Sequence, residues 1–277
     1  MAYGDYELLK IEIDGGVATA SIDAPPVNVM TLALFAELTR FGAEARDDEA
    51  IRAVVLKSAN PDFFIAHFDV SAILEFPVDA PAVRSPENPF HQMCEIYRTM
   101  PKATIAQIEG RVGGGGSELS QAFDMRFGVV GKTILSQMEV PLGILPGGGG
   151  TQRLPRLVGR SRALEIILGG DDIDAETLER WGLMNRIFAP EEIDDYVQRL
   201  AHRIASFPSE AIALAKQSVV AADIGLAEGL VEEGYLFQQS IRTDAAQQRM
   251  RRFMELGGQT RDVEIAVGDV VGRLGDV

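Results

Sequence analysis

The sequence has little cysteine, little positive charge and no long apolar run. A single cysteine, Cys94, among 277 residues excludes a disulfide framework and a cysteine-based zinc site, and it suits a reducing compartment. The 26 basic residues against 41 acidic ones give a net charge of −15, which argues against nucleic-acid and anionic-membrane partners because both require basic patches. Without a run of about 18 apolar residues or a signal-like N-terminus, we expect a cytoplasmic chain with no membrane partner.

Several nucleotide-binding and hydrolase motifs are also absent. The run Gly113–Gly116 completes no G-x-G-x-x-G pattern, and no lysine follows either of the two glycine runs as a P-loop requires. Ser117 lacks the second flanking glycine of a nucleophile elbow. We therefore expect neither a dinucleotide site, nor an NTP site, nor a serine hydrolase, and we expect no metal.

What the sequence does contain is two glycine runs, each with one glutamate beside it. Gly113–Gly116 precedes Glu118, and Glu139 precedes Gly147–Gly150. Glycine lets a backbone approach a ligand closely, and the start of a following helix presents unpaired N–H groups that can hold an oxyanion. The two carboxylates add a candidate acid and base. The local pattern alone also permits ordinary glycine turns beside solvated glutamates.

The segments Ile108–Leu119 and Met138–Leu154 resemble the crotonase superfamily of acyl-CoA enzymes, and within it the enoyl-CoA hydratase/isomerase family. The resemblance extends over residues 6 to 255. It implies an α/β fold, a superhelix of repeated ββα units with a C-terminal helical trimerisation region. The implied division is an acyl-CoA-binding core at 1–190, a helical oligomerisation region at 191–256 and a C-terminal extension at 257–277.

The resemblance also implies a role for each matching residue. Glu118 would be the base toward water, and Glu139 the proton donor to C2 of a 2-enoyl thioester. The N–H groups of Phe68 and Gly115 would form the oxyanion hole. Further substrate and CoA contacts would come from Ala66, which would face the adenine, and from His67, Phe68, Gly114, Gly115 and Gly147. The implied function is an enoyl-CoA hydratase acting on an acyl-CoA, with no cofactor besides the CoA of its substrate.

Two alternatives stay open at this stage. One is a Δ3,Δ2-enoyl-CoA isomerase, in which Glu139 alone shuttles the proton. The other is a homologue that binds acyl-CoA without turning it over. Because many family members lack one of the two carboxylates, the presence of both Glu118 and Glu139 favours the hydratase.

Local patterns predict the elements around these motifs. Asp14-Gly-Gly16 predicts a hairpin within residues 6–22, and Thr31 predicts the N-cap of a helix over 32–46. Four prolines predict an irregular loop over 76–90, which falls where the family places a lid. Further predictions are a strand over 53–57 and helices over 193–207, 209–222 and 226–256.

His67 and Phe68 depart from the small residues usual in this loop. We expect His67 to narrow the pocket rather than to transfer protons, and Asp69 to cap a helix instead of forming a dyad with it. Ala24 and the tail Gly257–Arg261 also replace usual CoA contacts. The net charge of −15 is unfavourable for an anionic CoA, so locally basic loops, such as those with Arg153, Arg156, Arg160 and Arg162, would have to compensate.

A last expectation concerns assembly. The predicted helix over 226–256 carries more apolar side chains than an isolated helix can hide, which favours self-association as a homotrimer or a hexamer. These side chains are Leu226, Leu230, Tyr235, Phe237, Ile241, Met250 and Phe253.

Overall fold

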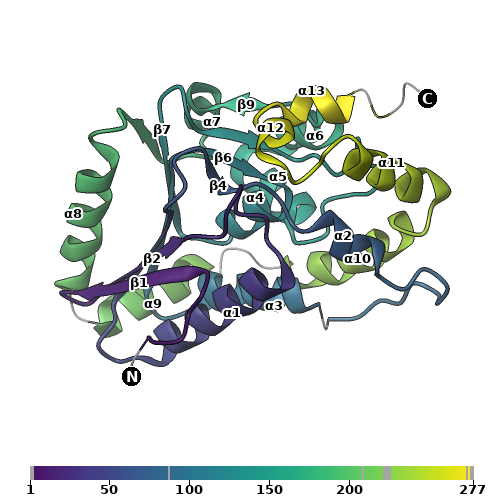
Figure 1. Cartoon of the computed structure of the whole chain (residues 1–277). Coiled ribbons are helices and arrows are strands. Elements are labelled where there is room, and N and C mark those ends of the chain that lie inside the picture. The colour runs from purple at the N-terminus through teal and green to yellow at the C-terminus, as the bar shows by residue number, and fades with distance from the viewer. Residues whose placement is uncertain (1–2, 87, 208, 221–225, 273, 275–277) are drawn as a thin grey trace.

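The chain winds through successive units of two strands and a helix (Figure 1). The computed structural model describes residues 3–86, 88–207, 209–220, 226–272 and 274. The first unit is β1 (Leu9–Asp14), β2 (Val17–Ile22) and α1 (Leu32–Asp47). The predicted hairpin is confirmed by the antiparallel β1–β2 pair, and the Thr31 side chain caps α1 as predicted. The second unit has β3 (Ala53–Ser58), β4 (Phe63–Ile65), α2 (Val70–Leu74) and α3 (Pro89–Thr99). The third has β5 (Ala103–Ile108), β6 (Arg111–Gly113) and α4 (Gly114–Ser120). The fourth has β7 (Met125–Val129), β8 (Ile134–Ser136), α5 (Gly150–Val158) and α6 (Arg160–Gly169).

From the second unit on, the two strands of each unit enter different sheets. The larger sheet has the order β1-β2-β3-β5-β7-β10, and the smaller has the order β4-β6-β8-β9. Within them, β3, β5 and β7 pair in parallel, as do β4, β6 and β8. The remaining short elements are β9 (Ile173–Asp174), α7 (Ala175–Trp181) and β10 (Arg186–Phe188). This alternation confirms the predicted α/β class and superhelical winding.

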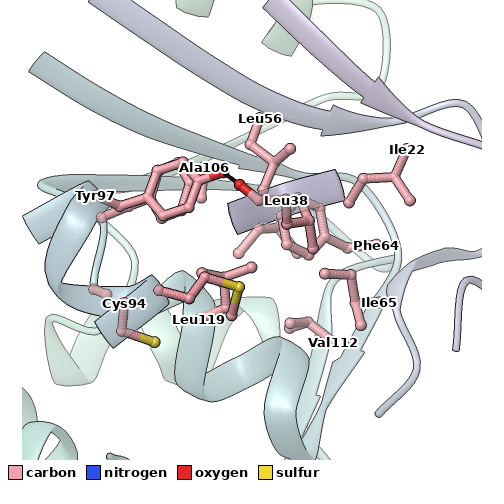
Figure 2. Close-up of a cluster of buried hydrophobic side chains, with 14 of the residues drawn as sticks. Ile22, Leu38, Leu56, Phe64, Ile65, Cys94, Tyr97, Ala106, Val112 and Leu119 are labelled. Atoms are coloured by element: carbon pink, nitrogen blue, oxygen red, sulfur yellow. Dashed lines mark hydrogen bonds between the residues drawn. The ribbon is translucent and has the colours of Figure 1, made fainter. Parts of the chain in front are cut away.

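A continuous core joins the two sheets to α1, α3 and α4 (Figure 2). Leu38, Leu56 and Leu119 are fully buried there, because each lies on an inward face of its helix or strand. The Tyr97 hydroxyl donates a 2.5 Å hydrogen bond to the Leu38 carbonyl, so the polar tip of this buried ring is satisfied. α4 is buried along its whole length, and it carries Glu118 into the interior.

The C-terminal third is helical, with two different packing partners. α8 (Ile193–Ala205) covers the outer face of the larger sheet through Val197 and Ala201. α9 (Ser209–Val220) follows it. α10 (Leu226–Ser240), α11 (Asp244–Glu255), α12 (Arg261–Ile265) and α13 (Val267–Gly272) lie on the opposite side, near α2 (Figure 1).

Three local predictions need correction. The helix predicted over 226–256 is two helices, because Thr243 caps a new start at α11. The loop predicted over 76–90 ends earlier, since Asn88 caps α3 and Pro89 stands in its first turn, where the missing N–H costs nothing. Four of the apolar side chains expected to drive self-association are instead buried within the chain: Leu230, Ile241, Met250 and Phe253. Tyr235 and Phe237 are half-buried, and the Leu226 side chain lies outside the described residues.

Candidate active site

A cavity of about 430 Å³ opens where α1, α2, α3 and α10 meet the two glycine runs. Its wall is mainly apolar and rich in phenylalanine. Two carboxylates, Glu118 and Glu139, interrupt that wall, with exposed fractions of 3% and 8%. Carboxylates are seldom this buried without a specific arrangement of donors around them. The phenylalanines of the wall are Phe35, Phe68, Phe76, Phe90 and Phe237.

The first glycine run lets α4 pack tightly beneath β4. A Cβ at Gly113 would lie 2.3 Å from the Ala66 carbonyl oxygen, and one at Gly116 would lie 2.6 Å from Ile65. Gly114 has φ +44°, a left-handed conformation that disfavours other residues. Glycine at these positions therefore sets the depth at which α4 carries Glu118.

The second glycine run binds the Glu118 carboxylate directly. The N–H groups of Gly148 and Gly150 each donate a 2.8 Å hydrogen bond to Glu118 Oε1. A Cβ at Gly148 would lie 2.7 Å from Glu118 Oε2, so a larger residue there would displace the carboxylate. Two N–H donors to one oxygen favour the ionised carboxylate, which is the form a general base requires. The two glycine runs of the sequence thus meet at one side chain.

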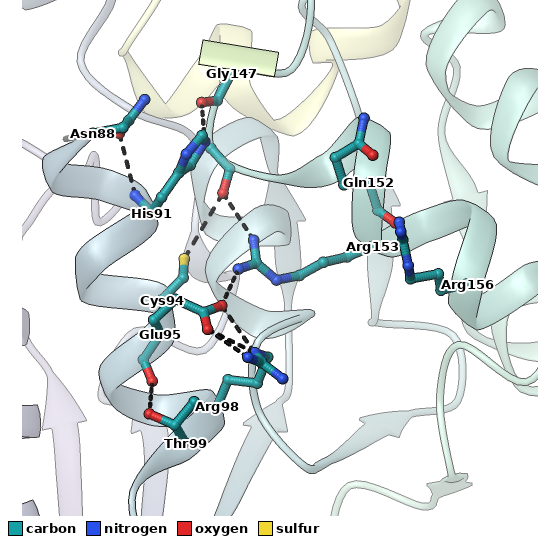
Figure 3. Close-up of polar contacts among 11 residues, drawn as sticks. Asn88, His91, Cys94, Glu95, Arg98, Thr99, Gly147, Gln152, Arg153 and Arg156 are labelled. Atoms are coloured by element: carbon teal, nitrogen blue, oxygen red, sulfur yellow. Dashed lines mark hydrogen bonds and ion pairs between the residues drawn. The ribbon is translucent and has the colours of Figure 1, made fainter. Parts of the chain in front are cut away.

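The carbonyl groups of this second run are held from the other side by α3 and α5 (Figure 3). His91 Nε2 donates to the Gly147 carbonyl at 2.9 Å, and Arg153 donates to the Gly148 carbonyl at 3.1 Å. Arg153 also pairs with Glu95 at 3.0 Å. Because the Gly147 carbonyl and the Gly148 N–H belong to one planar peptide and point in opposite directions, the His91 contact helps to direct the Gly148 N–H toward Glu118.

Glu139 lies in the turn that follows β8. Its backbone carbonyl accepts hydrogen bonds from the N–H groups of Leu142 and Ile144, both at 3.0 Å, which closes the turn. Its Oε2 accepts a 3.0 Å hydrogen bond from the Gln137 side chain. Oε1 lies 3.0 Å from the position of a Cβ at Gly114, so Glu139 adjoins the first glycine run.

The two N–H groups predicted to form an oxyanion hole lie beside each other. The His67 carbonyl accepts from Met30 N at 2.8 Å, and Asp69 N donates to the Met30 carbonyl at 3.1 Å. Because neighbouring N–H groups on an extended chain point to opposite sides, this pairing directs the Phe68 N–H away from Met30. A Cβ at Gly115 would lie 3.4 Å from Phe68 N. Gly115 is in the first turn of α4, where helical N–H groups lack intrahelical acceptors.

His67 is held by partners inside the protein. Its Nδ1 lies 2.8 Å from the Phe68 carbonyl oxygen, and its Nε2 lies 2.7 Å from Glu264 Oε1. Asp69 caps α2 by accepting from Ser71 N, as predicted. Burial opposes a charge on the His67 ring, but the carboxylate of Glu264 and the Phe68 carbonyl outweigh it and raise the pKa of His67.

Six of the eight predicted site residues line the cavity: Glu118, Glu139, Phe68, Gly115, His67 and Gly147. Ala66 does not; it is buried beside Val27 and Phe63. Gly114 also lies outside the lining, although it adjoins Glu139. Arg153, expected among the surface cations, is buried and bound to the glycine run.

Sequence reasoning missed two kinds of site residue. Asn88 and the start of α3 carried an available signal, a helix-capping residue followed by proline. Glu264 carried none, since it follows no motif and contacts a residue 197 positions away. Across the part of the chain that the structure describes, no group of three or more His, Cys, Asp or Glu side chains could hold a metal ion. No helix in that part is long and apolar enough to cross a membrane.

The sequence and the fold of this chain are similar to those of known proteins. A family model described as enoyl-CoA hydratase/isomerase matches residues 12–260. A Rhizobium meliloti (strain 1021) protein assigned as an enoyl-CoA hydratase is 34% identical over 254 residues, covering 90% of this chain and 95% of that protein. The short-chain-enoyl-CoA hydratase of Clostridium acetobutylicum is 30% identical over 250 residues, covering 88% and 94%. A crystal structure of a Streptomyces avermitilis protein assigned as an enoyl-CoA hydratase superposes with a TM-score of 0.89 at 36% identity, covering 99% of this chain and 100% of that one.

Proposed function

The chain belongs to the enoyl-CoA hydratase/isomerase family, and we propose that it is an enoyl-CoA hydratase, which adds water across the double bond of a 2-enoyl-CoA. The observation that carries this proposal is the placement of Glu118 and Glu139 in the wall of one apolar cavity. Hydration needs a base for water and an acid for C2, whereas isomerisation needs one group that moves a single proton. The phenylalanine-rich lining suits the acyl part of the substrate.

In this reaction Glu118 acts as the base. Its carboxylate, kept ionised by the N–H groups of Gly148 and Gly150, takes a proton from water as the oxygen bonds to C3. The π electrons move toward the thioester carbonyl, and Glu139 delivers its proton to C2 as the carbonyl re-forms. One proton enters Glu118 and one leaves Glu139, so the product carries the elements of one water molecule. Loss of the Glu118 proton to solvent and uptake of one by Glu139 then restore the starting protonation states.

The developing oxyanion is bound by the N–H groups of Phe68 and Gly115. Two observations support this part of the proposal. The contacts of Met30 with His67 and Asp69 direct the Phe68 N–H away from Met30. The Gly115 N–H belongs to the first turn of α4. Each donor of this kind is worth about 10²- to 10³-fold in rate. No cofactor is required, because the thioester itself activates C3.

The proposal extends to assembly and location. We propose a homotrimer or a hexamer, supported by exposed apolar side chains on two helices, among them Leu168 of α6 and Leu214 of α9, which are 62% and 65% exposed. We also propose a cytoplasmic location, with which a single buried cysteine thiol, Cys94, is compatible.

The direct test is to mix the purified chain with a panel of 2-enoyl-CoAs of increasing length and to follow the enoyl-thioester absorbance. Loss of the band with formation of a 3-hydroxyacyl-CoA is the expected result. A chain that converts 3-enoyl-CoA to 2-enoyl-CoA but never hydrates is an isomerase. Tight acyl-CoA binding without any product contradicts both activities.

A further inference from the structure

His67 connects the oxyanion-hole loop to the C-terminal end of the chain. The next residue, Phe68, supplies one of the two N–H groups assigned to the oxyanion. The His67 side chain is 3% exposed and that of its partner Glu264 is 1% exposed. An ion pair shielded this completely from water is held at a substantial desolvation cost, and removing one partner leaves the other as an uncompensated charge.

The hydrogen-bond pattern around His67 suits a doubly protonated ring. The Phe68 carbonyl at Nδ1 is an acceptor, and Glu264 Oε1 at Nε2 already accepts a 2.7 Å hydrogen bond from Gln259 N. Opposite an ionised Glu264, a neutral imidazole has only one N–H and would leave one of these contacts without a proton. The doubly protonated ring facing a carboxylate satisfies all three contacts. The charged groups whose fields act on the ring are Glu264 of α12 and Glu139 of the turn after β8.

The segment that carries Glu264 holds the same loop at other points. Gln259 Nε2 donates to Asp69 Oδ1 at 2.6 Å, and Gln259 itself takes a left-handed φ of +68°. The ring of Phe253, at the end of α11, packs edge-on against His67 at 5.7 Å between centroids. Phe68 is therefore held on both sides, through His67 before it and through Asp69 after it.

We infer that Glu264 and His67 form a positioning pair, in which the C-terminal segment fixes the loop that directs the Phe68 N–H into the cavity. Neither side chain transfers a proton to substrate, since both ring nitrogens face partners inside the protein. The pair acts through the Phe68 peptide, whose alignment matters because an oxyanion donor works only at the correct position. The kinetic part of this inference rests on the proposed function.

The kinetic test compares Glu264→Ala, Glu264→Gln and His67→Phe with the wild type on the best 2-enoyl-CoA. The inference predicts that kcat falls at least about tenfold in each, while KM changes less than about threefold, because the oxyanion contact strengthens in the transition state. The kcat of the double variant Glu264→Ala/His67→Phe should lie within about twofold of the kcat of the less active single variant, because the two residues act as a unit. Additive losses would overturn the inference, as would a folded Glu264→Ala enzyme with kcat within threefold of the wild type.

Arg261→Ala is the matched control. Arg261 joins the same C-terminal segment to Asp62 through an exposed ion pair, and it makes no described contact with the residues around Phe68. Its loss should leave kcat within about twofold. A loss as large as that of Glu264→Ala would show a general anchoring role and contradict a specific positioning pair. If Glu264→Ala does not fold, the kinetic comparison uses Glu264→Gln and His67→Phe, because both substitutions retain the side-chain volume and so avoid a cavity.

A second readout does not depend on activity. With ¹⁵N-labelled histidine, the ring of His67 should show both nitrogens protonated at about pH 7, and this signature should disappear in Glu264→Gln. The chain has three histidines, so His67→Phe assigns the signal. A neutral His67 ring in the wild type would overturn the inference. If the wild type hydrates no enoyl-CoA, the proposed function fails while the protonation result still decides the state of the pair.

Discussion

At the scale of single residues, the proposed mechanism assigns proton delivery to C2 to Glu139. Glu139→Gln preserves the side-chain shape and still offers an oxygen to Gln137, but it removes the ionisable proton. We predict that kcat falls at least about 10²-fold while substrate binding changes little. Steady-state hydration and equilibrium binding of the substrate measure the two parts. A variant that hydrates at the wild-type rate would show that C2 is protonated by another group.

The oxyanion hole is tested by two substitutions at one position. Gly115→Pro removes the donor, whereas Gly115→Ala keeps the N–H and adds a Cβ that would lie 3.1 Å from that of Phe68. We expect about 10²- to 10³-fold loss in kcat for the proline variant and a clearly smaller loss for alanine. Equal losses in the two variants would assign the effect to crowding and not to the missing donor.

The position of several candidate-site residues was predictable because they lie within short motifs, while their catalytic roles stay predictions. Glu118, Glu139, Phe68 and Gly115 all reach the cavity as the motifs implied. Glu264 could not be found in this way, because a buried pair between distant residues leaves no local pattern. His67 lies in the cavity lining, and its expected role in narrowing the pocket stays a prediction. Its hydrogen bonds to the Phe68 carbonyl and to Glu264 were not predictable from its sequence neighbours.

At the scale of elements, α3 and α5 hold the second glycine run through Glu95 and Arg153. Burial opposes ionisation of Glu95, but its contacts with Arg98 and Arg153 outweigh burial and lower its pKa below 4.5. The unfolded chain therefore binds this proton more readily. The stabilising contribution is full above about pH 4.5 and is lost as the pH falls through the lowered folded pKa.

We predict that Glu95→Gln lowers the unfolding midpoint at about pH 7 and flattens its decline toward about pH 3. Urea unfolding across this range measures both effects. Glu255→Gln is the control, because that carboxylate is exposed and pairs only at 3.4 Å with Arg252. An acid profile of Glu95→Gln parallel to that of the wild type would show that Glu95 contributes no proton linkage.

Elements with strong terminal signals were predicted well. The β1–β2 hairpin follows its Asp-Gly turn, and α1 begins after Thr31. The break between α10 and α11 was missed because no proline or glycine marks residues 241–243; the structure shows instead a cap at Thr243. The superhelical winding was implied by the resemblance alone, and the sheet order was not predicted, since it arises from crossovers that local patterns do not encode.

At the scale of the whole molecule, the chain buries four of the seven side chains that were expected to drive association. The C-terminal helices use Met250 and Phe253 to cover α2 and the turn after β8. An interface would therefore need further apolar side chains, and exposed leucines such as Leu168 of α6 and Leu214 of α9 are candidates. The division at residue 190 stays a prediction, although α8 packs directly on the larger sheet.

We predict that light scattering at micromolar concentration gives the mass of three copies of the 30.0 kDa chain, or of six. Exposed side chains such as Leu168 and Leu214 would then be covered. A well-behaved monomer at that concentration would contradict the proposed assembly.

The whole arrangement has one purpose under this account, which is to place two carboxylates with opposite tasks in one cavity. Glu118→Gln tests it most directly, because the amide oxygen can still accept from Gly148 and Gly150 but can no longer take a proton from water. The measurement is the rate of 2-enoyl-CoA hydration beside the rate of 3-enoyl-CoA isomerisation. The account predicts that hydration falls at least about 10²-fold with substrate binding retained. Hydration within about tenfold of the wild type, or a wild type that only isomerises and tolerates this change, would contradict it.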